Sequence, residues 1–377
     1  MKQRKLSLIS NNYSLEHLYT FKQVPISMGC TSKDKSEDIL QDQIWDICKD
    51  TGIIQLRNPL PLELVYAFPH NDGIGKVWED HYQDFANFIN KFNINKVLEI
   101  GGGAGRLGKL YLDKSPSYSW TMVEPNYSYQ VIDNPNFIHI TEWFDDDFKI
   151  ENEYDAVIHS HVFEHTYDPL SFLKVIHNYI DNTKLHIFSL PNLYKFLENR
   201  FTNALNFEHT VFLTEENIDL LLKKVGFELI EKEYYGEHSI FYACKKVKPQ
   251  GVEFKNFHLY EKNKSLFLDY VEYYQNEIKE LNQQIEKHNG EVFLFGGHIF
   301  SQFLIFNGLD INKIVSILDN SKMKQNNRLY GTSFIVKSPD VIKNCKNPAV
   351  ILKTASYNEE IKKDIIDNIS SNVIFFE

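Results

Sequence analysis

The sequence has few cysteines and no long apolar segment. Four of the 377 residues are cysteine, and these lie far apart without a C-x-x-C pair. Neither a disulfide framework nor a cysteine-based zinc site is therefore supported. The basic start is not followed by a sustained apolar stretch, and no run approaches the roughly 20 residues of a membrane-spanning helix. We expect a cytoplasmic protein that does not bind a membrane.

Positive charge is also scarce. The chain has 40 Lys and Arg against 51 Asp and Glu, a formal net charge of −11. Nucleic-acid binding depends on clustered Lys and Arg, so this balance argues against a nucleic-acid partner and favours a small-molecule substrate. Hydrophobic residues make up 43% of the chain, which is ample for folded cores, and the length predicts two or three domains. The oligomeric state stays open.

The most informative stretch is KVLEIGGGAGRLG at 96–108. A short apolar run breaks into glycines before apolar residues resume at helical spacing, which predicts a strand, a tight turn and a helix. Glycines let the backbone turn tightly and let a ligand approach without a Cβ in the way. Positions 103–108 fit the G-x-G-x-x-G pattern of dinucleotide sites, but that match alone is weak.

A second pattern in the same stretch has an acid in the strand end and glycines at alternate positions: Glu99, Gly101, Gly103 and Gly105. It resembles motif I of the class I S-adenosylmethionine (SAM) methyltransferases. In that motif the glycine loop faces the amino-acid part of SAM, and an acid after the second strand holds the ribose hydroxyls. Glu124 has that place here. The resemblance implies SAM as the cofactor and these five residues as part of its site.

Apolar runs alternate with helical stretches from Asn95 to about Lys246, which predicts an α/β, doubly wound parallel sheet. Ligands bind at the carboxyl ends of the strands in such sheets. By the same resemblance the loop after the third strand, TEWFDDD at 141–147, lies along the adenine, with Trp143 and Phe144 as its aromatic side chains. An acidic solvated loop is the alternative for 145–147.

The fourth predicted strand runs into HVFEHTYDP at 161–169. This phrase resembles the segment after strand four in class I methyltransferases that act on small molecules. The resemblance places His161 near the sulfonium of SAM and His165 on the following helix. Glu164 and His165 are alternatively a pair that orients the helix. His161 and His165 also have metal-ligand spacing, but no third ligand is evident in the sequence, and we predict no metal.

The segment NFEHTVFLTEE at 206–216 resembles the acceptor loop of sugar C-methyltransferases, in which a Tyr, a Glu and a His cluster. Glu208 and His209 match, whereas Asn206 stands at the Tyr position, which puts carbon methylation in doubt. SAM is already activated, so the enzyme must align an acceptor and remove its proton. We predict His209 as the base, Glu208 as its partner or a sugar ligand, and His165 as the second candidate base.

The first 85 residues contain WDICKDTGIIQL and LPLELVYAFPH, which resemble the small N-terminal domain of the same family. That domain holds zinc through paired cysteines, but here Cys48 is the only one kept, so we predict that the zinc is lost. Tyr66 and His70 stand where the family brings side chains over the SAM pocket, with a surface turn as the alternative. We expect a short helix over Ile39–Cys48 and a strand over Gly52–Leu56.

Beyond Lys246 the pattern changes to a long amphipathic helix over Phe257–Glu286 and a second strand–glycine–helix unit. The order GG…DNS-x-x-K-Q…G…SP resembles the Rossmann-like C-terminal domain of sugar C-methyltransferases, which helps to hold the nucleotide-sugar acceptor. The predicted acceptor contacts, for which a structural role is the alternative, are Gly296, His298, Asp319 and Lys324.

Together these observations predict a SAM-methyltransferase sheet with a small N-terminal domain and a second Rossmann-like domain. The predicted boundaries are 1–85, 86–246, a linking helix at 247–288, and 289–377. The predicted function is SAM-dependent methyl transfer to a carbon or oxygen of a nucleotide-activated sugar or a related precursor of surface glycan or natural product. An NAD(P)-dependent oxidoreductase and a non-catalytic protein on a SAM-type scaffold are the alternatives.

Overall fold

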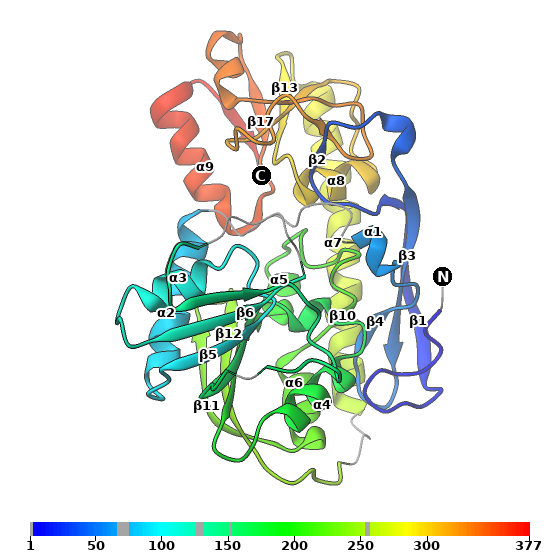
Figure 1. The fold of residues 1–377 in the computed structure, drawn as a ribbon. Coiled ribbons are helices and arrows are strands. Elements are labelled where there is room, and N and C mark those ends of the chain that lie inside the picture. The colour runs from blue at the N-terminus through cyan, green and yellow to red at the C-terminus, as the bar shows by residue number, and fades with distance from the viewer. Residues whose placement is uncertain (1–2, 66–74, 126–131, 151, 253–256) are drawn as a thin grey trace.

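The computed structural model describes residues 3–377 except 66–74, 126–131, 151 and 253–256. Its strands form a seven-stranded central sheet, a four-stranded N-terminal sheet, a five-stranded C-terminal sheet and one separate strand pair. Figure 1 shows the C-terminal sheet above the central sheet, with the long helix α7 (Phe257–Lys287) running alongside both. Among the described residues no helix is long and apolar enough to cross a membrane.

The central sheet has the strand order β11-β12-β9-β8-β5-β6-β7. The five strands from β9 to β7 are parallel, as the α/β pattern predicts. The prediction of a wholly parallel sheet is wrong, however, because β12 runs antiparallel to both of its neighbours, β11 and β9. The turn between β11 and β12 is too short for a crossover, so the two strands form a hairpin. The bounds are β5 Lys96–Ile100, β6 Ser119–Val123, β7 Phe137–Ile140, β8 Ala156–Ser160, β9 Leu185–Pro191, β11 Phe227–Tyr235 and β12 Ser239–Lys246.

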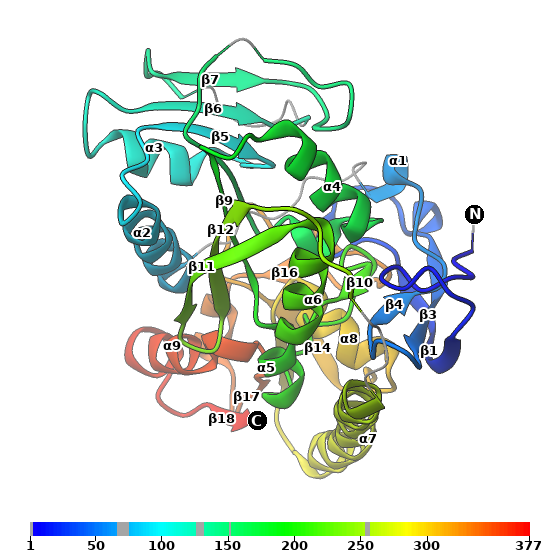
Figure 2. The ribbon, with the colours of Figure 1, turned by 90° about the horizontal axis from the view of Figure 1, so that it is seen from below.

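Helices cover both faces of the central sheet (Figure 2). Helices α2 (Lys76–Asn90) and α3 (Arg106–Leu112) share one hydrophobic cluster with one face of the sheet, and α4 (Pro169–Tyr179) and α6 (Glu215–Val225) share another with the opposite face. Helix α4 begins where a capping carboxylate precedes a proline in the first turn, an arrangement that satisfies free N–H groups at a helix start. The shorter helices are α1 Leu62–Val65 and α5 Leu193–Glu198.

The N-terminal sheet is antiparallel and has the order β1-β3-β4-β10. The helix predicted over Ile39–Cys48 is wrong, because this segment is strand β3, paired with β1 along its length. Its β-branched and aromatic residues fit a half-buried strand better than a helix. Strand β10 comes from the segment between β9 and β11 of the central sheet, so two distant parts of the chain build this sheet. The bounds are β1 Leu15–Pro25, β3 Leu40–Cys48, β4 Ile54–Leu56 and β10 Val211–Phe212.

Hydroxyl side chains surround Cys48 at the place where the sequence suggests a lost zinc site. The thiol Sγ lies 3.1 Å from Ser14 Oγ and 3.8 Å from Ser10 Oγ, and Cys48 is fully buried. Hydroxyl groups are much poorer zinc ligands than thiolates. The loss of zinc at this position stays a prediction, and Cys48 packs as a small buried side chain.

The C-terminal sheet is parallel and has the order β16-β14-β13-β17-β18. Helix α8 (Ile299–Phe306) follows β13 directly, and α9 (Asn358–Asp364) lies between β17 and β18 in the chain. Strand β15 leaves this region to pair with β2 of the N-terminal segment. The bounds of the strands are β2 Cys30–Thr31, β13 Val292–Phe295, β14 Ile314–Leu318, β15 Arg328–Leu329, β16 Val336–Lys337, β17 Ala349–Ile351 and β18 Ile374–Phe376.

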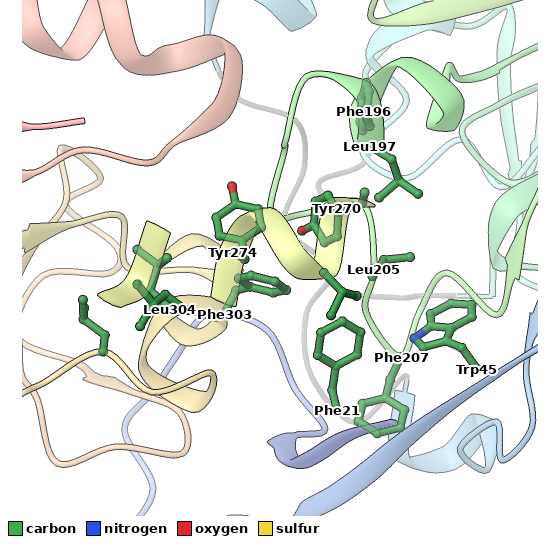
Figure 3. Packing of buried hydrophobic residues seen from close by; sticks show 14 of the residues in the cluster. Phe21, Trp45, Phe196, Leu197, Leu205, Phe207, Tyr270, Tyr274, Phe303 and Leu304 are labelled. Atoms are coloured by element: carbon green, nitrogen blue, oxygen red, sulfur yellow. The ribbon is translucent and has the colours of Figure 1, made fainter. Parts of the chain in front are cut away.

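The largest hydrophobic cluster of the described residues joins the N-terminal sheet, α5, α7 and the C-terminal sheet (Figure 3). Trp45 of the N-terminal sheet packs against Phe267 of α7, and Tyr270 of α7 packs against Phe303 of α8. Phe207, from the loop before β10, is buried in the same cluster. Burial of large aromatic groups at this junction therefore fixes how the sheets sit relative to one another.

The buried ion pair between Asp38 and Arg328 gives the first prediction. Arg328 Nη2 donates to Asp38 Oδ1 at 2.9 Å, and Gly331 N donates to Asp38 Oδ2 at 2.7 Å. Removal of one partner leaves an uncompensated buried charge. We expect Asp38→Ala to lower the free energy of unfolding in urea by about 3 kcal/mol. The exposed pair of Lys22 with Asp42 is the control, and Lys22→Ala should change it by less than about 1 kcal/mol.

Candidate active site

A cavity of about 900 Å³ lies between the carboxyl ends of the central strands and the C-terminal sheet. Gly105 is not among its lining residues, and Tyr66 and His70 fall outside the described residues. The cavity is lined by most of the residues singled out in the sequence, namely Glu99, Gly101, Gly103, Glu124, Trp143, Phe144, His161, His165, Glu208, His209, Gly296, His298, Asp319 and Lys324. The fold thus brings the predicted cofactor, catalytic and acceptor residues to one space.

The glycine loop after β5 leaves no room for side chains. Gly101 has φ +68°, and a Cβ there would lie 2.7 Å from Val162 Cγ2. A Cβ at Gly102 would lie 2.4 Å from Glu99 Oε2. Gly105, at φ +70°, is the residue from which helix α3 starts. The backbone of this loop therefore lines the cavity directly, as a close-fitting ligand requires.

Glu99 lies near the end of β5, just before the glycine loop. Its carboxylate accepts the Trp120 indole N–H at 2.7 Å and is almost completely buried. Burial raises the pKa of Glu99 to about 7, partly offset by the Trp120 hydrogen bond and aided by the nearby charge of Glu124. Glu99 lines the cavity, and its role in cofactor binding stays a prediction.

Glu124 follows β6 and faces the same loop. Its Oε2 accepts the backbone N–H of Gly103 at 3.1 Å. Trp143 is 50% exposed at the cavity, whereas Phe144 packs against Phe148 and Tyr179 at the edge of the core. The two aromatic residues of this loop thus differ, because Trp143 is half-exposed at the cavity whereas Phe144 also anchors the loop.

His161 is held rigidly at the end of β8. Its backbone is left-handed, with φ +54°, which is uncommon for a residue with a side chain. The ring Nε2 lies 3.0 Å from Ser239 Oγ, and Nδ1 lies 3.5 Å from Glu164 Oε1. The Trp78 ring packs edge-on against the imidazole. These contacts from three elements fix the ring beside the glycine loop.

Glu164, His165 and His209 come together at the cavity wall. One ligand atom from each lies within 4.8 Å of the other two. The Glu164 side chain is 1% exposed. Burial raises its pKa, but the hydrogen bond from His161 and the charges of the neighbouring histidines outweigh it and lower the pKa to about 2. The sequence predicts Glu164 only as a possible structural partner of His165, because His209, the third member of the cluster, comes from a distant loop.

Asn206 shapes the loop that carries two predicted catalytic residues. Its Oδ1 accepts the backbone N–H groups of Glu208 and His209, both at 2.8 Å, and its Nδ2 donates to Asn203 O at 3.1 Å. The side chain is buried and belongs to the turn. Asn206 stands where the family resemblance predicts a Tyr, and its side chain holds the backbone of the turn. In the same loop, His209 Nδ1 lies 3.1 Å from Ala204 O.

The C-terminal sheet supplies the opposite wall. Gly296, at φ +108°, turns the chain after β13, and Gly297 N donates to Asp319 Oδ2 at 2.9 Å. Lys324 Nζ donates to the same oxygen at 3.1 Å. Burial, with a smaller contribution from the charge of Lys324, lowers the pKa of His298 to about 4. A strand, a glycine turn and an acid after the next strand thus recur here.

Comparison with known proteins identifies the class. Residues 70–232 match a family model described as a methyltransferase domain. The chain therefore contains a class I SAM-dependent methyltransferase domain, and this domain includes the glycine loop, Glu124 and the His161–His165 segment. SAM is accordingly the cofactor, and the Cβ-free cradle at Gly101 and Gly102 beside the acid at Glu124 fits it.

Several solved structures are similar to part of the chain. The methyltransferase domain of bacterial CtHen1-C matches at 19% identity and TM-score 0.37, covering 46% of this chain and 100% of that one. A putative SAM-dependent methyltransferase from Listeria monocytogenes matches at 14% and 0.37, covering 45% and 100%. Human N-acetylserotonin methyltransferase in complex with SAM matches at 16% and 0.38, covering 46% and 53%. No curated protein matches.

A test of the glycine cradle is the substitution Gly101→Val. The added side chain would collide with Val162 and occupy a left-handed backbone conformation that a β-branched residue avoids. We expect calorimetric titration to show SAM binding weakened at least about tenfold, or about 1.4 kcal/mol. Gly251→Val is the control, because no atom lies within 4 Å of a Cβ there. Unchanged SAM affinity in Gly101→Val would place the cofactor elsewhere.

The raised pKa of Glu99 predicts a pH-dependent stability. Folded Glu99 keeps its proton up to about pH 7, whereas the unfolded chain loses it near 4.5, so the folded state binds more protons in this window. Stability contributed by Glu99 is therefore present below about pH 4.5 and lost as the pH rises to about 7. Relative to Glu99→Gln, wild-type protein should lose roughly 3 kcal/mol across this window in urea unfolding.

The control for this experiment is Glu228→Gln, which changes an exposed carboxylate paired with Lys245 on the edge of the central sheet. Its unfolding free energy should follow the wild-type pH profile. Parallel profiles for wild type and Glu99→Gln would contradict the assigned pKa, since a carboxylate with an ordinary pKa gives no such difference.

Proposed function

We propose that the protein transfers the methyl group of SAM to an oxygen or carbon of a nucleotide-activated sugar, or of a related precursor of surface glycan or natural product. The single observation that carries this proposal is the continuous cavity that joins the glycine loop after β5 to the glycine turn after β13. A small acceptor without a second binding surface would need only the first half of this space. An acceptor with a nucleotide at one end and a reactive sugar at the other spans it.

The features of the C-terminal wall favour a nucleotide. A backbone turn at Gly296, which lines the cavity, leads into the start of α8, and the positive end of a helix dipole favours a bound phosphate. Lys324 adds a positive charge within hydrogen-bond distance of Asp319 at the same edge. These groups suit the diphosphate and ribose of a nucleotide sugar, whose recognition depends on positive charge and backbone N–H donors.

The residues of the opposite loop and of the cavity wall are assigned to proton removal and acceptor binding. SAM supplies a methyl group already activated by its positive sulfur. The chain must then hold the acceptor in line and remove its proton, and positioning supplies much of the acceleration. We assign proton removal to the wall formed by Glu164, His165 and His209, with His209 as the predicted acceptor of the proton. Glu208, on the same loop, is the predicted ligand of a sugar hydroxyl.

The structure around Asn206 favours oxygen as the methylated atom. Carbon methylation requires removal of a much less acidic proton, which calls for additional stabilisation of the developing negative charge. The Tyr expected for that task is replaced by Asn206, whose Oδ1 is already occupied by two backbone N–H groups. An alcohol proton needs less help, and a histidine near neutral pH suffices.

The proposal is tested by screening nucleotide sugars for SAM-dependent methylation and by changing Lys324. We expect Lys324→Ala to raise KM for the nucleotide sugar roughly tenfold, because its charge binds the acceptor before and during reaction alike, while SAM affinity stays unchanged. Lys322→Ala is the matched control, since Lys322 is exposed on the same loop and does not line the cavity. Turnover with free sugars but not with nucleotide sugars would overturn the nucleotide assignment, and binding of NADH instead of SAM would favour an oxidoreductase.

A further inference from the structure

The cluster of Glu164, His165 and His209 has the composition of a metal site. Two imidazoles and one carboxylate form a donor set that divalent transition metals bind in proteins, with the remaining coordination positions left open. One potential ligand atom from each residue lies within 4.8 Å of the other two. Bonds from such ions to N and O ligands are about 2.0–2.2 Å, so side-chain shifts of about 1 Å would bring all three to binding distance.

A second observation points independently to a missing ligand. Glu164 Oε2 is buried and has no hydrogen-bond partner among the residues that the structure describes. Its other oxygen, Oε1, lies 3.5 Å from His161 Nδ1 and 3.8 Å from His165 Nε2. A carboxylate with 1% exposure requires a compensating positive charge or a full set of donors, because desolvation of an unpaired anion is very unfavourable.

The orientation of His209 is consistent with a ligand. Its Nδ1 lies 3.1 Å from Ala204 O, and a carbonyl oxygen only accepts, so Nδ1 carries the proton. Nε2 is then the nitrogen with a lone pair. A backbone carbonyl that fixes the second ring nitrogen in this way is the usual outer contact of a metal-bound histidine. The backbone N–H of His209 also donates to Asn206 Oδ1, which holds the backbone of His209 in place.

We propose that Glu164, His165 and His209 bind one divalent transition-metal ion, such as Zn²⁺ or Co²⁺, whose open positions face the cavity. This inference rests on the proposed function and refines its proton step. An acceptor hydroxyl that binds the ion becomes more acidic, and its O–H bond breaks with the proton passing to water in the cavity. The oxygen then attacks the methyl carbon while the C–S bond breaks and its electron pair goes to sulfur. His209 is a ligand in this scheme, and the ion takes its place in promoting loss of the proton.

The test is titration of metal-free protein, prepared by chelation and removal of the chelator, with Co²⁺. We expect calorimetry to show one Co²⁺ per chain, with visible absorption bands of nitrogen- and oxygen-bound cobalt. Glu164→Gln and His209→Gln should each weaken Co²⁺ binding at least about tenfold. His17→Gln is the matched control, because His17 lies on β1, far in sequence from the cluster, and bonds Thr20 Oγ1 at 2.8 Å.

SAM titration of each variant shows whether it is folded, since the glycine cradle lies outside the changed positions. Absence of stoichiometric Co²⁺ binding by the wild type would overturn the metal site. So would Co²⁺ binding by the two cluster variants that is as tight as that of the wild type. Methylation of a nucleotide sugar at an undiminished rate by metal-free protein would overturn the role of the ion and leave the proposed function intact. Stoichiometric Co²⁺ binding lost in the cluster variants would support the site even where no nucleotide sugar is methylated.

Discussion

The structure depends on the way the segment between α5 and α6 is anchored. Phe207 is buried in the core that the N-terminal sheet, α7 and α8 share, and β10 pairs with β4 a few residues later. Between these two anchors the side chain of Asn206 holds the backbone of Glu208 and His209. The cavity wall is therefore set by packing that lies outside the methyltransferase domain, and a change in that packing would move the predicted catalytic groups.

The two walls of the cavity have different physical characters. On the methyltransferase side the wall is mostly backbone, because Gly101 and Gly102 leave no space for a Cβ, which would collide with Val162 and Glu99. On the opposite side a charged pair, Asp319 with Lys324, borders the turn after β13. A cavity with a close-fitting backbone cradle at one end and a charged edge at the other suits two different ligands, which is what group transfer between a cofactor and an acceptor requires.

Much of the central fold followed from local pattern. The strand at 96–100, the glycine turn and the long helix after 257 have strong periodicity, and their predicted and observed bounds nearly coincide. The segment Ile39–Cys48 is predicted as a short helix, whereas pairing with β1 makes Leu40–Cys48 a strand. Such a segment is decided by a partner strand that local sequence does not reveal.

The sequence by itself determined the glycine cradle, the acid at Glu124 and hence the methyltransferase class, because these features depend on residue types at fixed short spacings. Only the tertiary structure decided that His209 meets Glu164 and His165, and that Asn206 serves the turn in place of a Tyr. The physical reason is the range of the interactions. A glycine turn is specified by neighbouring φ values, whereas a cluster of three side chains depends on a long loop held in place by a distant hydrophobic core.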